Sequence, residues 1–578
     1  MKLKKVRIQN FKSIKDIEFE FPDTGIIVLV GENNSGKSNI IRAIDAICGE
    51  GWYGREKLED RDYYLRDTKK QIRVDLYYDD NKSFCFQPSP KDWGVAYYKN
   101  WEQTTKMPFG QSIKDDFPCT YLGADRTLDK HLSFYDWTLI GRIRKAFHKR
   151  VTDASKKELE AKFEEIIQSF SKVPGFDQFR NDFSNFYNEL APYSKSKLKI
   201  DFKPFSPSNY FKTLQIIASE PSLGNKPIDL DELGEGARNL VLLSLLRSYA
   251  KNFKGTTELS GILALEEPEL FLHPHARRHL FYILHEIAKN GIQVIISTHS
   301  SSFIDTEYFD EIGRVVKVTN ADGNDETNII MTSKAALVKK CHDTGVPILK
   351  ADESSIVEFY KTTSNIRLNE GFFSKCLILV EGETEELALP VFLNNRGINC
   401  DALGISIISV NGKNQIPKYW RLYSTFDIPI IVIIDNDNTP DKEKSNTNIS
   451  NCFGIPIDHI LNFDGTNVAL ESMVDTTPLL ILKNDFETCL KEEIGTELYN
   501  QYQQEAKQII KPIGNQQKGV IARYIARKVI ENTPEYTPSF IETLIGLLTE
   551  YIPQDEEVLQ SANTEEEPLT ETNDDLPF

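Results

Sequence analysis

The feature that most constrains this chain is a glycine-rich loop between a predicted strand and a predicted helix. Residues 25–30 are an apolar run of strand length, residues 31–38 read GENNSGKS, and residues 39–48 have helical periodicity. In a GxxxxGKS loop with these flanks, main-chain N–H groups surround phosphates, the lysine reaches the β and γ phosphates, and the next hydroxyl holds Mg²⁺. The predicted nucleotide contacts are Gly31, Asn34, Gly36, Lys37, Ser38 and Asn39.

Two further apolar runs end in carboxylates. Leu377–Val380 leads into Glu381, and Pro429–Ile434 leads into Asp435 and Asp437. Continuous apolar runs of this length predict strands that are buried on both faces of a parallel sheet. Ligands bind open α/β sheets at the carboxyl ends of their strands, and the i, i+2 spacing lets both aspartates face the same way.

A fourth acid, Glu385, lies one helical turn after Glu381. If Gly382 turns the chain into a helix, Glu385 faces back towards the other acids. Four convergent carboxylates repel one another, so we expect a cation among them, and hard oxygen ligands suit Mg²⁺ or Mn²⁺. Two such ions would clamp an in-line phosphoryl displacement, with Glu381, Glu385, Asp435 and Asp437 as ligands.

Two lysines are placed to assist such chemistry. Lys518 lies at a predicted helix start, and as a point charge near the metal pair it would stabilise the transition-state phosphate. Lys413 follows the predicted strand 405–410. It either faces a phosphate or lies on the surface, and the sequence leaves both open.

Composition narrows the class of protein. A chain of 578 residues has room for about two to four domains. No segment has the roughly 20 apolar residues that span a membrane, and the N-terminal residues lack a signal-peptide core. The eight cysteines are scattered without a CxxC pair, which favours reduced thiols and a cytoplasmic location over a disulfide framework or zinc ribbon. With a net charge of −18, any contact with DNA must use local basic patches.

The N-terminal half resembles the RecF/SMC-like branch of the ABC ATPases in two sequence segments, IQNFKSIKD and GENNSGKSN. Residues 262–269 (ILALEEPE) resemble its Walker B, which implies that Glu266 holds Mg²⁺ and Glu267 polarises the attacking water. His299 ends the switch strand and is implied to sense the γ-phosphate. The signature loop is degenerate: Gly236 remains as an anion contact, but Gly234 replaces the usual serine, which implies slow turnover.

The later acidic pattern, LVEGETE followed by DND, resembles a Toprim domain. An ABC-type ATPase followed by Toprim in one chain resembles the OLD (overcoming lysogenisation defect) family of ATP-dependent nucleases. That resemblance implies ATP and Mg²⁺ or Mn²⁺ as cofactors and DNA as substrate. It also implies a homodimer or larger assembly, and a role in phage defence or DNA repair, with partner proteins of a defence system.

The expected fold class is therefore α/β, in five parts. An ABC-type ATPase domain occupies residues 1–335, with a helical dimerisation insertion at about 135–195. A helical linker follows at 336–371, the Toprim core at 372–475 and a helical part of the nuclease region at 476–553. Residues 554–578 are expected to be an acidic, disordered tail.

Other functions stay open at this stage. One is a DNA-sensing or DNA-loading ATPase that does not cleave, although the presence of all four acids argues against it. A Toprim topoisomerase would need a catalytic tyrosine on a DNA-gate domain, for which the chain has no space. A primase would normally bring a zinc ribbon, which the cysteine pattern excludes.

The tail carries one further pattern. Residues 573–578 (NDDLPF) resemble the tip of bacterial single-stranded-DNA-binding proteins, in which a terminal phenylalanine and its carboxylate dock on genome-maintenance enzymes. The resemblance implies either partner proteins that read such tails or self-docking of the tail. The alternative is an acidic solvating segment that ends this way by chance.

Overall fold

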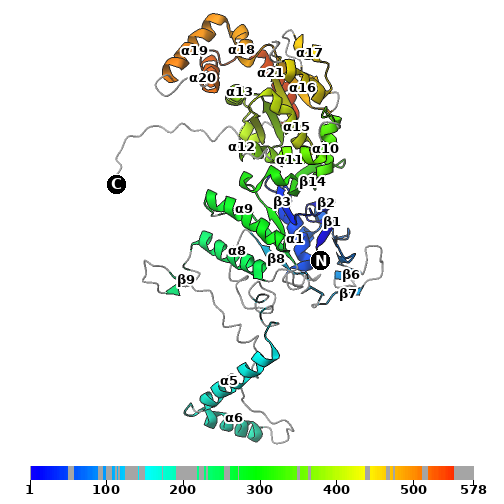
Figure 1. Ribbon diagram of the computed structural model, residues 1–578, viewed down its shortest axis with the longest axis vertical. Coiled ribbons are helices and arrows are strands. Elements are labelled where there is room, and N and C mark those ends of the chain that lie inside the picture. Colours follow the sequence, from blue (N-terminus) through cyan, green and yellow to red (C-terminus); the bar gives the residue numbers. More distant parts are fainter. Residues whose placement is uncertain are drawn as a thin grey trace, which may run out of the picture.

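The computed structural model contains two α/β units in succession along the chain, with a helical pair that projects from the first (Figure 1). The structure describes residues 2–49, 58–88, 95–98, 107–110, 113–114, 117–123, 141, 143, 147, 150–171, 173–190, 218–219, 227–228, 232, 234–252, 261–270, 272–347, 352–361, 366–436, 443–463, 469–472, 475–510 and 518–551.

The chain starts with an antiparallel sheet. In its first hairpin, buried and more accessible positions alternate, as expected where one face of a sheet lies on a core. The sheet order is β2 (Ile14–Glu20), β1 (Leu3–Phe11), β4 (Arg73–Tyr78), β5 (Ser83–Phe86), β6 (Val95–Tyr98) and β7 (Met107–Pro108).

A second six-stranded sheet forms the centre of the first unit. Its strands run parallel except at one edge, and three of them are buried at every position, as continuous apolar runs predict. The order is β14 (Asp325–Met331), β13 (Ile312–Thr319), β3 (Ile26–Val30), β12 (Gln293–Ser297), β11 (Ile262–Glu266) and β8 (Cys119–Leu122). Helix α1 (Lys37–Cys48) follows the loop after β3, as predicted.

Four longer helices belong to this unit. The pair α5 (Asp153–Ser171) and α6 (Phe176–Leu190) lies at the end of the molecule opposite the second unit (Figure 1). Both fall inside the helical insertion predicted at about 135–195, although much of 124–149 lies outside the described residues. Helix α8 (Glu235–Asn252) packs against α9 (Pro274–Lys289), and strand β9 (Ala218–Ser219) pairs antiparallel with β10 (Pro227–Ile228).

Helices connect this unit to the second sheet, as predicted for residues 336–371. They are α10 (Lys334–Asp343), α11 (Glu353–Lys361) and α12 (Ile366–Asn369). The second sheet is parallel except for one edge strand, in the order β16 (Ile405–Ser409), β15 (Cys376–Val380), β17 (Ile430–Asp435), β19 (Pro478–Leu482) and β18 (Ala469–Glu471). Its helices are α13 (Glu383–Asn395), α14 (Cys400–Leu403), α15 (Ile416–Ser424), α16 (Glu443–Phe453) and α17 (Ile457–Leu461).

The sheet continues beyond the predicted boundary at residue 475. Residues 476–553 were expected to be helical, but β19 pairs with β17 inside the sheet. Its apolar run is short, and periodicity alone cannot separate such a strand from a helical segment. Beyond β19, the described residues form helices, as expected there: α18 (Phe486–Ile494), α19 (Thr496–Ile510), α20 (Lys518–Asn532) and α21 (Ser539–Leu548). The tail at 554–578 lies outside the described residues.

Seven short 3-10 helices complete the described elements: η2 (Asp60–Asp62), η3 (Tyr64–Arg66), η8 (Ser301–Phe303), η9 (Thr306–Glu311), η10 (Glu370–Phe373), η11 (Lys413–Gln415) and η12 (Thr549–Tyr551). Within the part of the chain that the structure describes, none of the helices has the length and apolar character needed to cross a bilayer.

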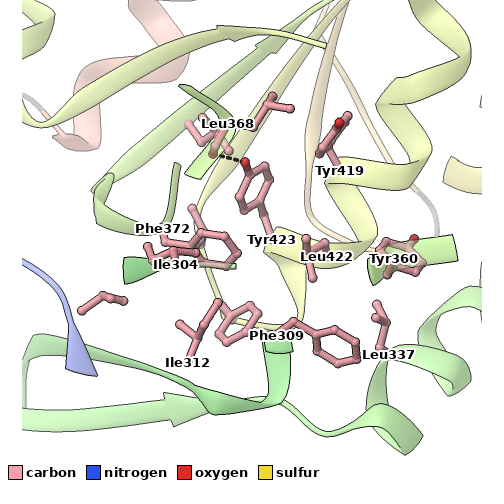
Figure 2. Packing of buried hydrophobic residues seen from close by; sticks show 14 of the residues in the cluster. Ile304, Phe309, Ile312, Leu337, Tyr360, Leu368, Phe372, Tyr419, Leu422 and Tyr423 are labelled. Atoms are coloured by element: carbon pink, nitrogen blue, oxygen red, sulfur yellow. Dashed lines mark hydrogen bonds between the residues drawn. The ribbon is translucent and has the colours of Figure 1, made fainter. Parts of the chain in front are cut away.

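One hydrophobic core runs between the two units. Figure 2 shows Phe309 and Ile312 of the first unit facing Phe372 and Tyr423 of the second, and all four are buried. The Phe372 ring meets the Tyr423 ring edge-on with centroids 5.1 Å apart, and the Tyr423 hydroxyl donates to the carbonyl of Leu368. A continuous core of this kind resists relative motion of the units more than a polar interface would.

Candidate functional site

The glycine-rich loop has the backbone that its glycines require. Gly31 has a φ of 144° and Gly36 a φ of 110°, which side chains other than glycine rarely adopt. A Cβ on Gly31 would lie 2.1 Å from the carbonyl oxygen of Val315, and one on Gly36 would lie 2.2 Å from Oγ1 of Thr327. Strand β13 and strand β14 therefore pack directly on the loop and set its shape.

Lys37 lies over the loop. Its Nζ donates to the carbonyls of Gly31 (3.0 Å) and Glu32 (2.6 Å). Burial lowers the pKa of Lys37 to about 8, against the opposing effect of nearby carboxylates, first among them Glu267. A phosphate is a stronger acceptor for this ammonium group than a carbonyl, so the position suits a triphosphate.

The other predicted loop residues take different places. Ser38 follows Lys37 in the first turn of α1, where its main chain belongs to the helix N-terminus that favours an anion. Asn34 is exposed with a φ of 63°. The side chain of Asn39 donates to Oγ of Ser13 (2.7 Å), which lies beside Gly36 of the loop, and the predicted contact of Asn39 with a nucleotide stays a prediction.

Strand order brings the remaining ATPase residues to the same edge of the sheet. β3 pairs with β12, and β12 pairs with β11, so Glu266, Glu267 and the residues after Ser297 follow adjacent parallel strands. Glu267 has a φ of 45° and donates its main-chain N–H to the Ser297 carbonyl (2.7 Å). A left-handed glutamate is strained, and such strain is concentrated at functional positions.

His299 is half-buried beside these acids. Burial lowers its pKa, the nearby Lys37 lowers it further, and Glu267 opposes both. The sequence reasoning missed Glu269, which accepts from Oγ1 of Thr298 (2.6 Å) and from the main-chain N–H of His299 (3.0 Å). The signal was present as the last acid of the EEPE run, but only the fold shows that it holds the switch residues.

The predicted signature glycine, Gly236, is the second residue of α8. Gly234 precedes that helix and is exposed. Helix α8 packs against α9, and the role of Gly236 at a second subunit's phosphate stays a prediction.

The second candidate site lies at the carboxyl ends of β15 and β17. These strands are adjacent and parallel, with Leu379 opposite Val432, so Glu381 and Asp435 follow neighbouring strands as predicted. Oε1 of Glu381 accepts the main-chain N–H of Asp435 at 2.9 Å. Two acids from distant parts of the sequence thus meet at one sheet edge. Asp437 lies outside the described residues.

Glu385 lies on the first turn of α13 and is buried. Its Oε2 accepts the main-chain N–H of Gly382 at 3.1 Å, so it closes a capping arrangement at the helix start. The pKa of Glu385 is raised to about 7, chiefly by burial; main-chain hydrogen bonds oppose the rise, and the charges of Glu381 and Glu487 contribute to it. Glu487, on α18, was not predicted, and it also accepts from Oγ1 of Thr384 (3.4 Å).

Lys413 is buried beside Glu381, which excludes the surface position that the sequence left open; a phosphate contact stays a prediction. Its Nζ lies 3.8 Å from Oε1 of Glu381 and donates to the carbonyl of Asp435. Only 3% of its side chain is exposed. Lys518, by contrast, is exposed at the start of α20, whose next residue, Gly519, packs on the main chain of Glu383.

The donor set fits a divalent cation. Glu381 and Asp435 offer hard oxygen donors, and the buried Lys413 already marks a position where positive charge is needed among them. Among the described residues, which exclude Asp437, no group of three or more His, Cys, Asp or Glu side chains is arranged to hold a metal ion. All six predicted metal ligands therefore remain predictions: Glu381, Glu385, Asp435, Asp437, Ser38 and Glu266.

Comparison with protein families matches both units. The model of an AAA ATPase domain matches residues 1–117 and 96–304, and the model of the TOPRIM domain of overcoming lysogenization defect-like proteins matches residues 372–437. The chain belongs to the OLD family. In this family an ATPase domain is joined to a TOPRIM domain, which implies use of a nucleotide and of a divalent metal.

Curated relatives agree with the OLD family. An OLD nuclease from Thermus scotoductus is 24% identical over 77% of this chain and 83% of its own length. The Old nuclease of Escherichia phage P2 is 24% identical over 76% of this chain and 77% of its own length. Endonuclease GajA from Bacillus cereus is 26% identical over 38% of this chain and 33% of its own length.

Proposed function

We propose that this OLD family protein is an ATP-regulated, divalent-metal-dependent DNA endonuclease. The observation that carries the proposal is the meeting of Glu381 and Asp435 at one sheet edge, in a chain whose other unit has a complete phosphate loop. The relatives named as nucleases support DNA phosphodiester hydrolysis as the reaction.

The residues of the acidic site divide the work. Glu381, Asp435 and the predicted ligands Asp437 and Glu385 would hold Mg²⁺ or Mn²⁺, which when bound stabilises charge on the attacking and leaving oxygens. With its pKa raised to about 7 by burial, Glu385 is also suited to exchange a proton near neutral pH. Lys413 keeps positive charge beside Glu381, and Lys518, which is exposed at the start of α20, would supply charge that stabilises the transition-state phosphate.

The ATPase unit binds and hydrolyses ATP in this proposal. Lys37 would exchange its loop carbonyls for the β and γ phosphates, Ser38 and Glu266 would hold Mg²⁺, and Glu267 would orient the attacking water. His299 would sense the γ-phosphate from the adjacent strand. A homodimer or larger assembly would bring Gly236 of one chain to the loop of another, with partner proteins of a phage-defence or repair system.

A plasmid assay tests the proposal. Supercoiled plasmid is incubated with the purified chain and Mn²⁺ or Mg²⁺, with and without ATP. Nicked and linear products that disappear in Asp435→Ala, but persist in the control Asp401→Asn on the exposed start of α14, support a nuclease. Relaxed closed circles would indicate a topoisomerase. Unchanged plasmid under all conditions would favour the non-cleaving DNA-sensing ATPase.

A further inference from the structure

The two sites of the chain are joined by a buried arginine. Arg314 lies on β13, where it pairs in register with Val30, the last residue of β3 before the phosphate loop. The next residue of β13, Val315, places its carbonyl against Gly31. Arg314 is thus one residue from the main chain that shapes the loop.

The side chain of Arg314 reaches into the TOPRIM unit. Its guanidinium donates to the carbonyls of Phe426 (3.2 Å) and Asp427 (2.9 Å), and to that of Ser374 (3.0 Å). Ser374 lies two residues before β15, and Asp427 lies three residues before β17. One side chain of the ATPase unit therefore holds the starts of both strands that end at Glu381 and Asp435.

Burying the charge of Arg314 costs free energy, so these hydrogen bonds are needed to hold it in place. Arg314 is only 7% exposed, and burial lowers its pKa to about 10, with the charges of Asp427 and Glu32 partly offsetting that effect. A buried guanidinium stays charged, so the carbonyls must supply its hydrogen bonds. Asp427 is held with a φ of 50°, a left-handed conformation that costs of order 1 kcal/mol.

A second link leaves the loop itself. Oε1 of Glu32 lies 3.3 Å from Nζ of Lys375, the residue immediately before β15. The carbonyl of the same Glu32 accepts from Lys37 at 2.6 Å. If Lys37 turns to a phosphate, it releases the carbonyl of Glu32. The side chain of Glu32 is the one that pairs with Lys375 of the TOPRIM unit.

The switch loop is tied to the same place. Nδ2 of Asn369 donates to the carbonyls of Ser301 (3.3 Å) and Ile304 (2.8 Å), just after His299. Asn369 is buried, and η10 leads from it to Ser374, one of the carbonyls held by Arg314. Both phosphate-sensing segments thus converge on the starts of β15 and β17, which are themselves joined by a hydrogen bond from Leu377 to the Pro429 carbonyl (2.8 Å).

We propose that Arg314 and Lys375 are positioning residues that transmit occupancy of the phosphate loop to the acidic site. They do so by shifting the starts of β15 and β17, roughly 20 Å along the strands from Glu381 and Asp435. The strands are buried on both faces and move as rigid elements, so a displacement at one end alters the separation of the acids at the other. The inference rests on the proposed nuclease function.

The experiment compares three variants by their plasmid cleavage rates in Mn²⁺ with and without ATP. Lys375→Met removes the half-exposed pair with Glu32 without disturbing the core, and Arg314→Lys keeps the buried charge but loses the three-way fork. The matched control is Lys340→Met. It removes another ion pair between α10 and the TOPRIM unit, Lys340–Asp475 at 2.8 Å, which lies away from the loop.

We expect the ratio of rates with and without ATP to move at least about fivefold towards one in Lys375→Met and Arg314→Lys, the lower end of ordinary coupling energies. In Lys375→Met the ATP affinity and the ATP-free rate should stay within about twofold of the wild type, since loss of an exposed pair costs little. Lys340→Met should keep the wild-type ratio. Unchanged ratios in both variants, an equal change in the control, or a wild-type ratio of one would overturn the inference.

A second measurement separates this inference from the nuclease proposal. Hydrogen exchange of peptides that contain residues 374–382 and 426–436 is compared with and without a non-hydrolysable ATP analogue. The analogue should change exchange in the wild type but not in Lys375→Met, and no wild-type change would refute the link. Failure of the wild type to cleave DNA would refute the nuclease proposal alone, because exchange does not depend on cleavage.

Discussion

At the scale of the residue, the acidic site depends on charge balance. Glu381 meets the main chain of Asp435, Lys413 lies beside both, and Glu385 is buried with a raised pKa. Carboxylates at this density are stable only with positive charge nearby. Two residue-level predictions follow from that balance.

Glu381→Ala or Asp435→Ala should lower the DNA cleavage rate on the order of 100-fold or more, because each removes a ligand of the proposed metal site. Asp435→Ala removes one negative charge but keeps the main-chain groups that bond Glu381 and Lys413, so its thermal unfolding midpoint should not fall. The rates come from plasmid cleavage in Mn²⁺, with Asp401→Asn as the control. Normal cleavage by Asp435→Ala would rule out the proposed site.

Lys413→Met should destabilise the metal-free protein by about 1–3 kcal/mol, because it leaves the buried Glu381 carboxylate and the Asp435 carbonyl short of a donor. Saturating Mn²⁺ should recover more stability in this variant than in the wild type, since bound metal replaces the missing charge. Thermal unfolding with and without Mn²⁺ measures both effects. An identical Mn²⁺ shift in the two proteins would show that Lys413 lies apart from the metal position.

At the scale of the element, the ends of parallel strands place the reactive groups, and helix packing fixes the strand ends. β3, β12 and β11 are neighbours and bring Lys37, His299 and Glu267 together. In the TOPRIM unit, α13 follows Glu381 directly and packs on α20. Close helix contact there holds the acidic edge in place.

The phosphate loop and the Walker B strand should separate binding from turnover. Lys37→Ala should abolish ATP binding, because the buried ammonium is the loop's charge for the phosphates. Glu267→Gln should bind ATP normally, but its rate of ATP hydrolysis should fall by about 100-fold or more, since the amide cannot polarise water. Fluorescent-nucleotide titration and phosphate release give the two quantities. Normal hydrolysis by Glu267→Gln would move the catalytic role to another acid.

Gly519 should be required for contact between α20 and α13. A Cβ there would lie 2.8 Å from the carbonyl oxygen of Glu383, so Gly519→Ala should cost about 1–3 kcal/mol of unfolding free energy. Gly546 in α21 is the matched control, because a Cβ at that position meets no atom within 4 Å. Gly546→Ala should be neutral or stabilise by up to about 1 kcal/mol. Urea unfolding compares them, and equal effects would contradict the packing argument.

At the scale of the whole molecule, the two units share one core. Phe309, Ile312, Phe372 and Tyr423 are buried between them (Figure 2). The hydrogen bonds of Arg314 cross the same boundary. A shared core makes the stability of one unit depend on the other. The proposed link between the phosphate loop and the acidic site therefore runs through the same boundary that holds the two units together.

Phe309→Ala should destabilise the chain by about 3–5 kcal/mol, because it leaves a cavity between the units. Calorimetry should show the ATPase and TOPRIM transitions both moving to lower temperature. Phe183→Ala on the projecting helix α6, where the side chain is partly exposed, is the control and should leave both transitions in place. A shift of the ATPase transition alone would mean that the units unfold independently.

The sequence by itself determined the local elements and their chemistry. The phosphate loop, the strands before Glu381 and Asp435, and the Walker B acids all follow from short apolar runs and adjacent motif residues, which are local signals. The sequence did not predict that β19 belongs to the sheet, because an apolar run that short has the same pattern in a strand and in a helix.

Only the tertiary structure decided which of these elements meet. Four features join residues that are far apart along the chain. They are the pairing of β15 with β17, the burial of Lys413 beside Glu381, the hydrogen bond from His299 to Glu269, and the hydrogen bonds of Arg314 to the TOPRIM unit. Periodicity reports which face of an element is buried but not what lies against it. Lys413 and Arg314 look like any surface cation in the sequence, because their roles come from the carbonyls and carboxylates that folding brings to them.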